Sequence, residues 1–387
     1  MQIGNWDMRI RDNSQEVSAE IDGFRLWYRL PLGYHVSRVG DPFLAAAFFP
    51  AMATGEDIEL EQGLTVSSML EENLKRLQDV FSCWNPLLRH FNICGERGVS
   101  ESCNDGVASY FSGGVDSLHT VHSNQKEITH LIYINGFDFE ISPEVFQRSI
   151  AHNHHYAKHY GNMSLVPVET NYFSFIKEYR VGRALNHGSC LASIGHLLGF
   201  RKILIPASYT YAQGVPWGST PLTDPMWSTE ATAFVHHGAE AKRTEKTIVL
   251  SEDKAIVDNL VVCWRQPDYN CCECSKCLRT MLTLHILGKD ARAFARRFQM
   301  SDFKKIKISD HHDIHFVQEN YELAEERGRR EIAATLDKII RRYEIRQTFY
   351  RIEKHLLRGQ MKKLYRRLRN REDQRVWLTP VGKDFAA

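Results

Sequence analysis

The feature that most constrains the fold of this chain is an alternation of strand-like and helical patterns between about residues 105 and 285. Short apolar runs typical of buried strands occupy residues 107–111, 131–134, 165–168, 203–207 and 260–264. Helical patterns lie between them, for example at residues 189–198, where Gly199 ends the pattern. A chain that alternates in this way builds a parallel sheet with right-handed crossovers. We therefore expect an α/β fold with a Rossmann-like parallel sheet.

The segments on either side of this core have different patterns. Residues 1–100 combine short alternating strands, at 17–30, with a helix whose apolar residues recur at 69, 70, 74, 77 and 80. The last hundred residues have a helical pattern. A chain of 387 residues that is 43% hydrophobic is expected to form two or three domains. We predict an N-terminal α/β accessory domain at 1–100, the core domain at 105–285 and a helical C-terminal region at 286–387.

Charge and hydrophobicity argue against several classes of protein. The net charge is +2, so no overall electric field favours nucleic acid or a membrane surface. The richest apolar stretch, residues 42–53, is too short to span a bilayer and contains Pro50. Charged residues at 7, 9, 11 and 12 stand where a signal peptide needs an apolar segment. We expect a cytoplasmic protein without a membrane span.

Two glycines and three small polar residues separate the first core strand from the next helix, in the string Ser112-Gly113-Gly114-Val115-Asp116-Ser117. Ligands of parallel sheets bind beyond the carboxyl ends of the strands, where this string lies. Glycines let the backbone turn sharply and approach a ligand, and N–H groups at a helix N-terminus bind phosphate. Asp116 suits a phosphate site if it holds a metal ion. The alternative is an ordinary tight turn in which Asp116 caps the helix.

The string resembles the signature of the PP-loop ATP-pyrophosphatase family, whose fold is of the adenine nucleotide alpha hydrolase type. In that family the loop holds the triphosphate of ATP, a substrate oxygen attacks the α-phosphorus, and pyrophosphate leaves. The resemblance implies ATP and Mg²⁺ as cofactors, with the magnesium ion near Asp116. It implies nucleotide contacts at Ser112, Gly113, Gly114, Val115, Asp116, Ser117, Gly136 and Gly188. Among these, Asp116 and Ser117 would take part in catalysis.

A cluster of cysteines forms the second motif, in which Cys263 is followed by Cys271, Cys274 and Cys277. The nine cysteines of a cytoplasmic chain are not expected to form disulfides, and this density indicates a metal site. Four thiolates around one ion make a closed, tetrahedral zinc site with a structural role. The alternatives are an iron–sulfur cluster and buried cysteines without a metal. Cys272 is a spare thiol, and the positive charges of Arg265, Lys276 and Arg279 would offset the thiolates.

The loop and the cysteines together resemble the 7-cyano-7-deazaguanine synthase family over residues 105–285. That family activates a carboxylate with ATP and converts it with ammonia to an amide and then a nitrile. The basic helix start at residues 242–246 matches the family, which implies a substrate contact for Arg243 and a catalytic role for Lys246. The family's Tyr-Pro-Asp-Cys loop is replaced here by residues 214–228, where Asp224 is the one match. A carboxylated deazaguanine is the substrate that the resemblance favours.

The loop at residues 208–229 is long for a compact domain, and long loops at strand ends are usually functional. Trp217 and Trp227 either stack on a planar substrate ring or pack the loop itself. The resulting hypothesis is a ligase that adenylates a small-molecule carboxylate and transfers the acyl group to ammonia or an amine. The amine of a peptide or protein is an equal candidate for the acceptor.

Two other functions compete with the ligase. In the first, a PP-loop tRNA sulfurtransferase, a cysteine carries sulfur, and Cys190 is the candidate. In the second, the chain is a non-catalytic nucleotide-binding module that keeps the loop but has lost the chemistry. The intact glycines and Asp116 argue against this second alternative.

The C-terminal part of the chain carries a basic tail. Residues 341–371 include twelve Lys and Arg and two Glu. An apolar stripe runs along the same segment, at Leu357, Met361, Leu364 and Leu368. This pattern is typical of a basic amphipathic helix. We favour a helix docked on its own domain or on a second copy in a homodimer, over an RNA-binding arm or a membrane-surface helix.

Overall fold

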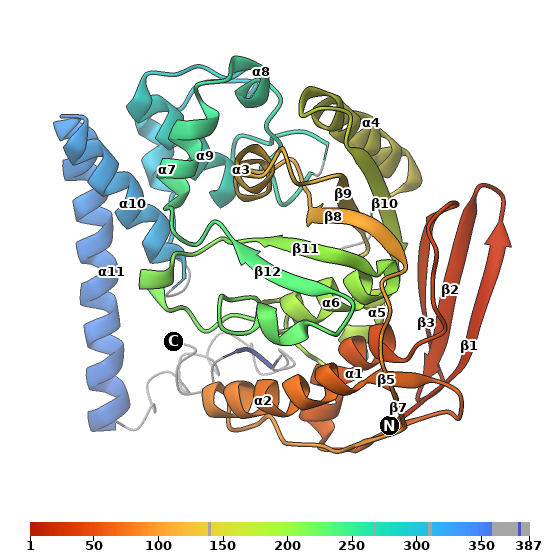
Figure 1. Ribbon diagram of the computed structural model, residues 1–387. Helices are drawn as coiled ribbons and strands as arrows, with labels where there is room; N and C mark the ends of the chain where they lie inside the picture. The colour runs from red at the N-terminus through yellow and green to blue at the C-terminus, as the bar shows by residue number, and fades with distance from the viewer. Residues whose placement is uncertain (138–140, 267, 309–311, 358–377, 381–387) are drawn as a thin grey trace.

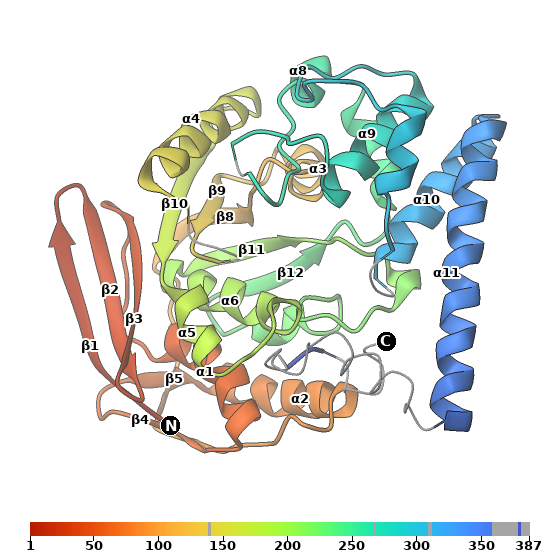
Figure 2. The ribbon, with the colours of Figure 1, turned by 180° about the vertical axis from the view of Figure 1, so that it is seen from behind.

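The computed structural model describes residues 1–137, 141–266, 268–308, 312–357 and 378–380, and Figures 1 and 2 show it from opposite sides. Within these residues, ten strands form one mixed sheet in the order β12-β11-β8-β9-β10-β3-β2-β1-β4-β6, and β5 pairs with β7. The strands are β1 (Gln2–Arg11), β2 (Ser14–Ile21), β3 (Phe24–Pro31), β4 (Ile58–Leu60), β5 (Thr65–Ser67), β6 (Ile93–Cys94), β7 (Glu96–Gly98), β8 (Asn104–Tyr110), β9 (His130–Asn135), β10 (Ser164–Thr170), β11 (Phe200–Pro206) and β12 (Ala233–His237). The α/β class expected from the sequence is confirmed.

Five neighbouring strands, from β12 to β10, are parallel and form the core of the sheet. Four of the strands expected here are present as β8, β9, β10 and β11. The strand expected at residues 260–264 is wrong, because this segment joins no sheet; its Val261 N–H donates to the Gly113 carbonyl at 3.0 Å. The fifth parallel strand is β12, where His236 and His237 follow three apolar residues. Residues 260–262 are apolar because they are buried among helices, so hydrophobicity alone misplaced the strand.

The first hundred residues extend this sheet. The antiparallel strands β1, β2 and β3 form a meander, and β3 pairs with β10 through Arg29 and Glu169. Helix α1, with residues Asp41–Thr54, is buried along most of its length and packs against α6, residues Arg183–Leu198. The helix expected around residues 69–80 is present as α2 (Ser68–Trp84). Residues 1–100 therefore share one sheet and one hydrophobic core with the central segment, and their independence as a domain stays a prediction.

Helices cover both faces of the sheet, as Figure 1 shows. One face carries α1, α2, α5 and α6, and the other carries α3, α4, α7, α8 and α9. The helices not yet given are α3 (Val115–Ser123), α4 (Pro143–His159), α5 (Tyr172–Glu178), α7 (Arg243–Leu250), α8 (Lys254–Val257), α9 (Ser275–Leu287), α10 (Asp313–Glu326) and α11 (Arg330–Leu357), with the short 3-10 helices η1 (Tyr211–Gln213), η2 (Asp224–Trp227) and η3 (Met300–Lys305). In the parallel strands, successive side chains enter opposite hydrophobic clusters, as Ile203 and Leu204 do.

The C-terminal region contributes α10, which packs on α7 and α9, and the long α11, which packs on α10 at the edge of the molecule (Figure 1). The start of α11 is buried through Ile332, Leu336 and Ile340, whereas Ile345 and Phe349 farther along are exposed. The expected apolar stripe lies beyond this point, and its Met361, Leu364 and Leu368 fall outside the described residues. Among the described helices, none is long and apolar enough to cross a membrane.

Candidate functional site

The loops that follow the parallel strands meet at one edge of the sheet. The glycine-rich string follows β8, Gly136 follows β9, Ser208 follows β11 and Gly238 follows β12. Since these strands are parallel, their carboxyl ends lie at the same edge. This edge is where open parallel sheets bind their ligands.

The glycine-rich string forms a compact turn into α3. Gly113 has a φ of 71°, which favours glycine, and Gly114 is the N-cap residue of the helix. The Ser117 hydroxyl donates to the Gly114 carbonyl at 3.0 Å, and the Ser112 N–H donates to the Ser117 oxygen at 3.3 Å. No side chain caps the helix, so the alternative in which Asp116 is the cap is wrong. Within the described part of the chain, no side chain accepts from the first N–H groups of α3.

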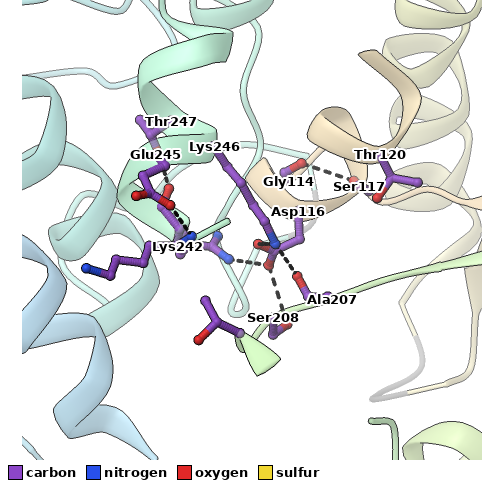
Figure 3. Close-up of polar contacts among 12 residues, drawn as sticks. Gly114, Asp116, Ser117, Thr120, Ala207, Ser208, Lys242, Glu245, Lys246 and Thr247 are labelled. Atoms are coloured by element: carbon purple, nitrogen blue, oxygen red, sulfur yellow. Dashed lines mark hydrogen bonds and ion pairs between the residues drawn. The ribbon is translucent and has the colours of Figure 1, made fainter. Parts of the chain in front are cut away.

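The Asp116 carboxylate points away from its helix and toward α7 (Figure 3). It forms an ion pair with Arg243 and lies 3.7 Å from the Lys246 ammonium group, while the Ser208 hydroxyl donates to it at 3.4 Å. The Lys246 ammonium also donates to the Ala207 carbonyl at 2.7 Å. Lys246 is 1% exposed, so the first turn of α3, the end of β11 and α7 are joined by buried charged contacts.

The local sequence explains why two cations of α7 reach one carboxylate. Arg243 and Lys246 are three residues apart and therefore share one face of the helix. Lys242 is the N-cap residue, and its N–H donates to the Glu245 carboxylate at 2.7 Å. The N–H of Arg243 donates to Glu319 of α10 at 3.0 Å. The N–H groups at the start of α7 thus donate to carboxylates on both α7 and α10.

Helix α9 adds a further arginine to this site. The Arg279 guanidinium lies 3.8 Å from the centre of the Phe316 ring, in a cation–π contact with α10. It lines a small pocket together with Arg243 and Glu319. Arg279 was expected to offset the charge of the cysteines, but these contacts place its head group at the Asp116 site instead.

The charge of this site is unbalanced. Burial by itself raises the pKa of Asp116, but the cations of α7 and α9 outweigh it and lower that pKa below its ordinary value. We call these cations the cation cluster: Arg243, Lys246, Lys276 and Arg279. Among the described residues, the Nε atoms of Arg243 and Arg279 have no hydrogen-bond partner. Buried donors are normally paired, so this excess of positive charge and of donors suits an anionic ligand.

Two residues at the site were not identified from the sequence. His119 follows Asp116 by three residues on α3, and burial, followed by the charge of Lys246, lowers its pKa to about 4. This imidazole is therefore neutral at pH 7, and its helical spacing from Asp116 could have revealed it. Glu319 is 3% exposed and lies outside the predicted core domain, so no motif pointed to it.

The two glycines expected at the nucleotide have close neighbours within the chain. A Cβ atom on Gly136 would lie 1.8 Å from the Thr170 carbonyl oxygen, and one on Gly188 would lie 2.2 Å from the Gly218 oxygen. Both positions therefore require glycine for packing. Gly188 also lies within α6 and not at its start, since that helix begins at residue 183. Their contacts with a nucleotide stay predictions.

The residues expected to contact the substrate lie in different environments. Asp224 has no exposed surface and accepts from the Ser219 hydroxyl and the His236 ring, each at 2.7 Å. A substrate could reach it only if the loop opened. Trp227 is also fully buried and packs on the Phe48 ring at 5.2 Å, so it packs the loop and is not available for stacking.

Trp217, by contrast, is partly exposed and belongs to an aromatic group at the end of β11. Its ring lies 6.0 Å from Tyr209 and 5.2 Å from His312. The Tyr209 ring also lies 5.5 Å from the Phe316 ring, and the Arg279 guanidinium makes its cation–π contact with the same Phe316 ring. The predicted substrate residue Trp217 is thus linked through aromatic rings to Arg279, which lines a pocket together with Arg243, whereas Asp224 belongs to a separate buried network.

The cysteine cluster is assembled as the sequence predicts. The sulfur atoms of Cys263, Cys271, Cys274 and Cys277 all lie within 4.8 Å of one another. Cys263 and Cys274 are 3.8 Å apart, and Cys271 and Cys277 are 3.9 Å apart. Tetrahedral Zn–S bonds of about 2.3 Å place sulfur atoms about 3.8 Å apart. These residues therefore form a cluster that can hold a metal ion such as zinc.

The chain around the cluster favours thiolates. Backbone N–H groups point at the sulfurs of Cys263, Cys271 and Cys274 at 3.3 to 3.5 Å. Hydrogen bonds of this kind stabilise a negatively charged acceptor. Asn270 fixes the loop by accepting from the Val262 N–H at 2.9 Å. The neighbouring Cys272 is not among the clustered residues.

Comparisons with models of known families, with curated proteins and with solved structures gave no match.

Proposed function

We propose that this protein is an ATP-dependent ligase that forms AMP and pyrophosphate, adenylating a small-molecule carboxylate and passing the acyl group to ammonia or an amine. The observation that supports the proposal is the excess positive charge around Asp116, at the carboxyl edge of the parallel strands. A polyphosphate would neutralise the cation cluster, and it would supply acceptors for the buried, unpartnered Nε atoms of Arg243 and Arg279 once these side chains turned toward it. The PP-loop type of fold belongs to the same proposal.

In the first step, an oxygen of the carboxylate attacks the α-phosphorus, and the bond between that phosphorus and the bridging oxygen breaks. Pyrophosphate departs with the electron pair of the broken bond. The N–H groups of α3 and the side chains of Arg243 and Lys246 would stabilise the charge on the departing oxygens. Asp116 Oδ1 accepts no hydrogen bond from the described residues and lies 3.7 Å from the Lys246 ammonium group; it is the atom that would hold Mg²⁺ if that ammonium group turned to the phosphates. When bound, magnesium neutralises phosphate charge.

In the second step, nitrogen attacks the acyl carbon of the adenylate and AMP leaves. The product is an amide, or a nitrile after a second round of activation. No protein nucleophile is needed, because AMP is already a good leaving group. A planar heteroaromatic carboxylate of the carboxylated deazaguanine kind is the proposed substrate, with Trp217 and its aromatic neighbours beside it.

Product analysis tests the proposal. With the right carboxylate and amine, the protein is expected to convert ATP into AMP and pyrophosphate in equal amounts. Separation of the nucleotides by chromatography, together with a pyrophosphate assay, gives the answer. Accumulation of ADP and inorganic phosphate would contradict the assignment.

The sulfurtransferase is the second candidate, and the burial of Cys190 argues against it. This thiol is 0% exposed and lies in the core beneath the sheet with Tyr110 and Tyr172. A cysteine that carries sulfur must be reached by a donor and by a substrate.

We therefore expect Cys190→Ser to leave turnover nearly unchanged while lowering the free energy of unfolding by about 1 kcal/mol, since a buried Cys acts as a small apolar group. Steady-state kinetics and thermal unfolding check this expectation. If instead product formation stopped while adenylation continued, sulfur delivery would be supported. Cys103→Ser, at a partly exposed thiol, is the matched control.

A further inference from the structure

Helix α10 lies outside the predicted core domain but reaches the candidate site through Glu319. This side chain is 3% exposed and uses both carboxylate oxygens. One accepts the Arg243 N–H at 3.0 Å, and the other accepts the Gln213 side-chain amide at 2.9 Å. Glu319 therefore connects three segments that are distant in sequence: α10, the first turn of α7 and the loop at residues 208–229.

The contact with α7 matters because that helix is only eight residues long. The first N–H groups of a helix have no partners within it, and short helices fray unless an outside group holds them. Glu319 satisfies the Arg243 N–H, which belongs to the residue whose side chain pairs with Asp116. Lys246 lies one turn farther along the same face, so the orientation of the first turn determines where both cations point.

The same face of α10 also orients the arginine of α9. Phe316 precedes Glu319 by three residues, which places the two side chains on one face of the helix. The Phe316 ring supports the Arg279 guanidinium at 3.8 Å. Glu322 follows Glu319 by three residues and pairs with the Lys242 ammonium group at 2.6 Å, but its side chain is 53% exposed. The buried contacts of α10 are therefore the ones directed at the cation cluster.

We propose that Glu319 is a positioning residue that aligns the cation cluster for a polyphosphate and links it, through Gln213, to the loop at residues 208–229. The inference rests on the proposed function, and it names a residue outside the loop and cysteine motifs. Glu319 does not touch the ligand. It acts through Arg243 and Lys246.

Binding of inorganic pyrophosphate to the full chain, measured by calorimetry, tests this role. Glu319→Ala is expected to raise the dissociation constant about tenfold or more, because the hydrogen bonds of a buried carboxylate are lost. Glu319→Gln keeps an acceptor for the Arg243 N–H and should restore most of the affinity. Glu322→Gln, on the same helix but exposed, is the matched control and should bind as the unaltered chain does. Thermal unfolding of the same variants separates the two roles, because a purely structural role predicts that affinity falls only as far as the folded fraction does.

Hydrogen exchange of the peptide at residues 242–250, without ligand, is the second measurement. Glu319→Ala should accelerate exchange in this peptide, whereas Glu322→Gln should not. If Glu319→Ala does not fold, Gln213→Ala replaces it, with an expected loss of affinity of about threefold from one missing hydrogen bond. If the unaltered chain does not bind pyrophosphate, the proposed function fails, and exchange still decides the role of Glu319. Unchanged exchange, or binding by Glu319→Ala equal to that of the unaltered chain, overturns the inference.

Discussion

Replacing Asp116 with alanine is expected to stop pyrophosphate release. The carboxylate is the negative charge that Arg243 and Lys246 share. Without it the two cations lose the partner that orients them, and Mg²⁺ loses its proposed ligand. We expect turnover to fall by at least about a hundredfold, the scale seen when one preorganised electrostatic contact is removed.

Two measurements separate these effects. Pyrophosphate release during turnover reports on the chemistry, and calorimetry with pyrophosphate reports on binding. Asp116→Asn, which keeps the shape of the side chain, should also lose turnover and shows that the effect is not due to a cavity. Ser208→Ala is the control, because this exposed hydroxyl donates to the same carboxylate at 3.4 Å and its loss should change turnover little. Full turnover in the Asp116 variants would remove the basis of the proposed mechanism.

The substitution Cys274→Ser is expected to release the metal and to destabilise the protein severely. Cys274 is a member of the cluster and is also the N-cap residue of α9, which carries Arg279. A structural metal contributes its binding free energy to folding, so its loss should cost more than about 4 kcal/mol of the free energy of unfolding. Because α9 starts at the cluster, the change should also weaken pyrophosphate binding through Arg279.

Metal analysis and chemical denaturation check this prediction. The unaltered chain should contain about one zinc ion, bound by four cysteines, and show no visible charge-transfer colour. Cys272→Ser is the control beside the cluster; it should keep the metal and change stability by about 1 kcal/mol. A brown protein with stoichiometric iron and acid-labile sulfide would contradict zinc and favour an iron–sulfur cluster.

Local chemistry made the two motifs predictable from the sequence. Gly113 needs a positive φ, and glycine tolerates it at no steric cost, so the turn is encoded where it occurs. The cysteines are close in sequence, from Cys263 to Cys277, so a short loop is enough to bring the four sulfurs together. Helix α6 likewise ends at Gly199, which adopts the left-handed conformation expected of a helix stop.

In contrast, the sequence alone could not show which residues are buried or what they pack against. Asp224 and Trp227 have the composition of a substrate loop, yet the tertiary structure buries both of them. The apolar segment at residues 260–264 is hydrophobic like a strand but packs among helices, while the edge strand β12 has too few apolar residues to be noticed. In each case the residue types are compatible with two environments, and only the packing distinguishes them.

The sequence by itself determined the α/β class, the position of the glycine-rich turn and the set of four cysteines, because each depends on residues that are near one another in the chain. Only the tertiary structure decided which charges surround Asp116. Arg243 lies 127 residues from Asp116 along the chain, and Glu319 lies a further 76 residues beyond Arg243. No periodicity or spacing encodes a contact over such distances, because it arises from how the sheet and the helices α7, α9 and α10 pack together.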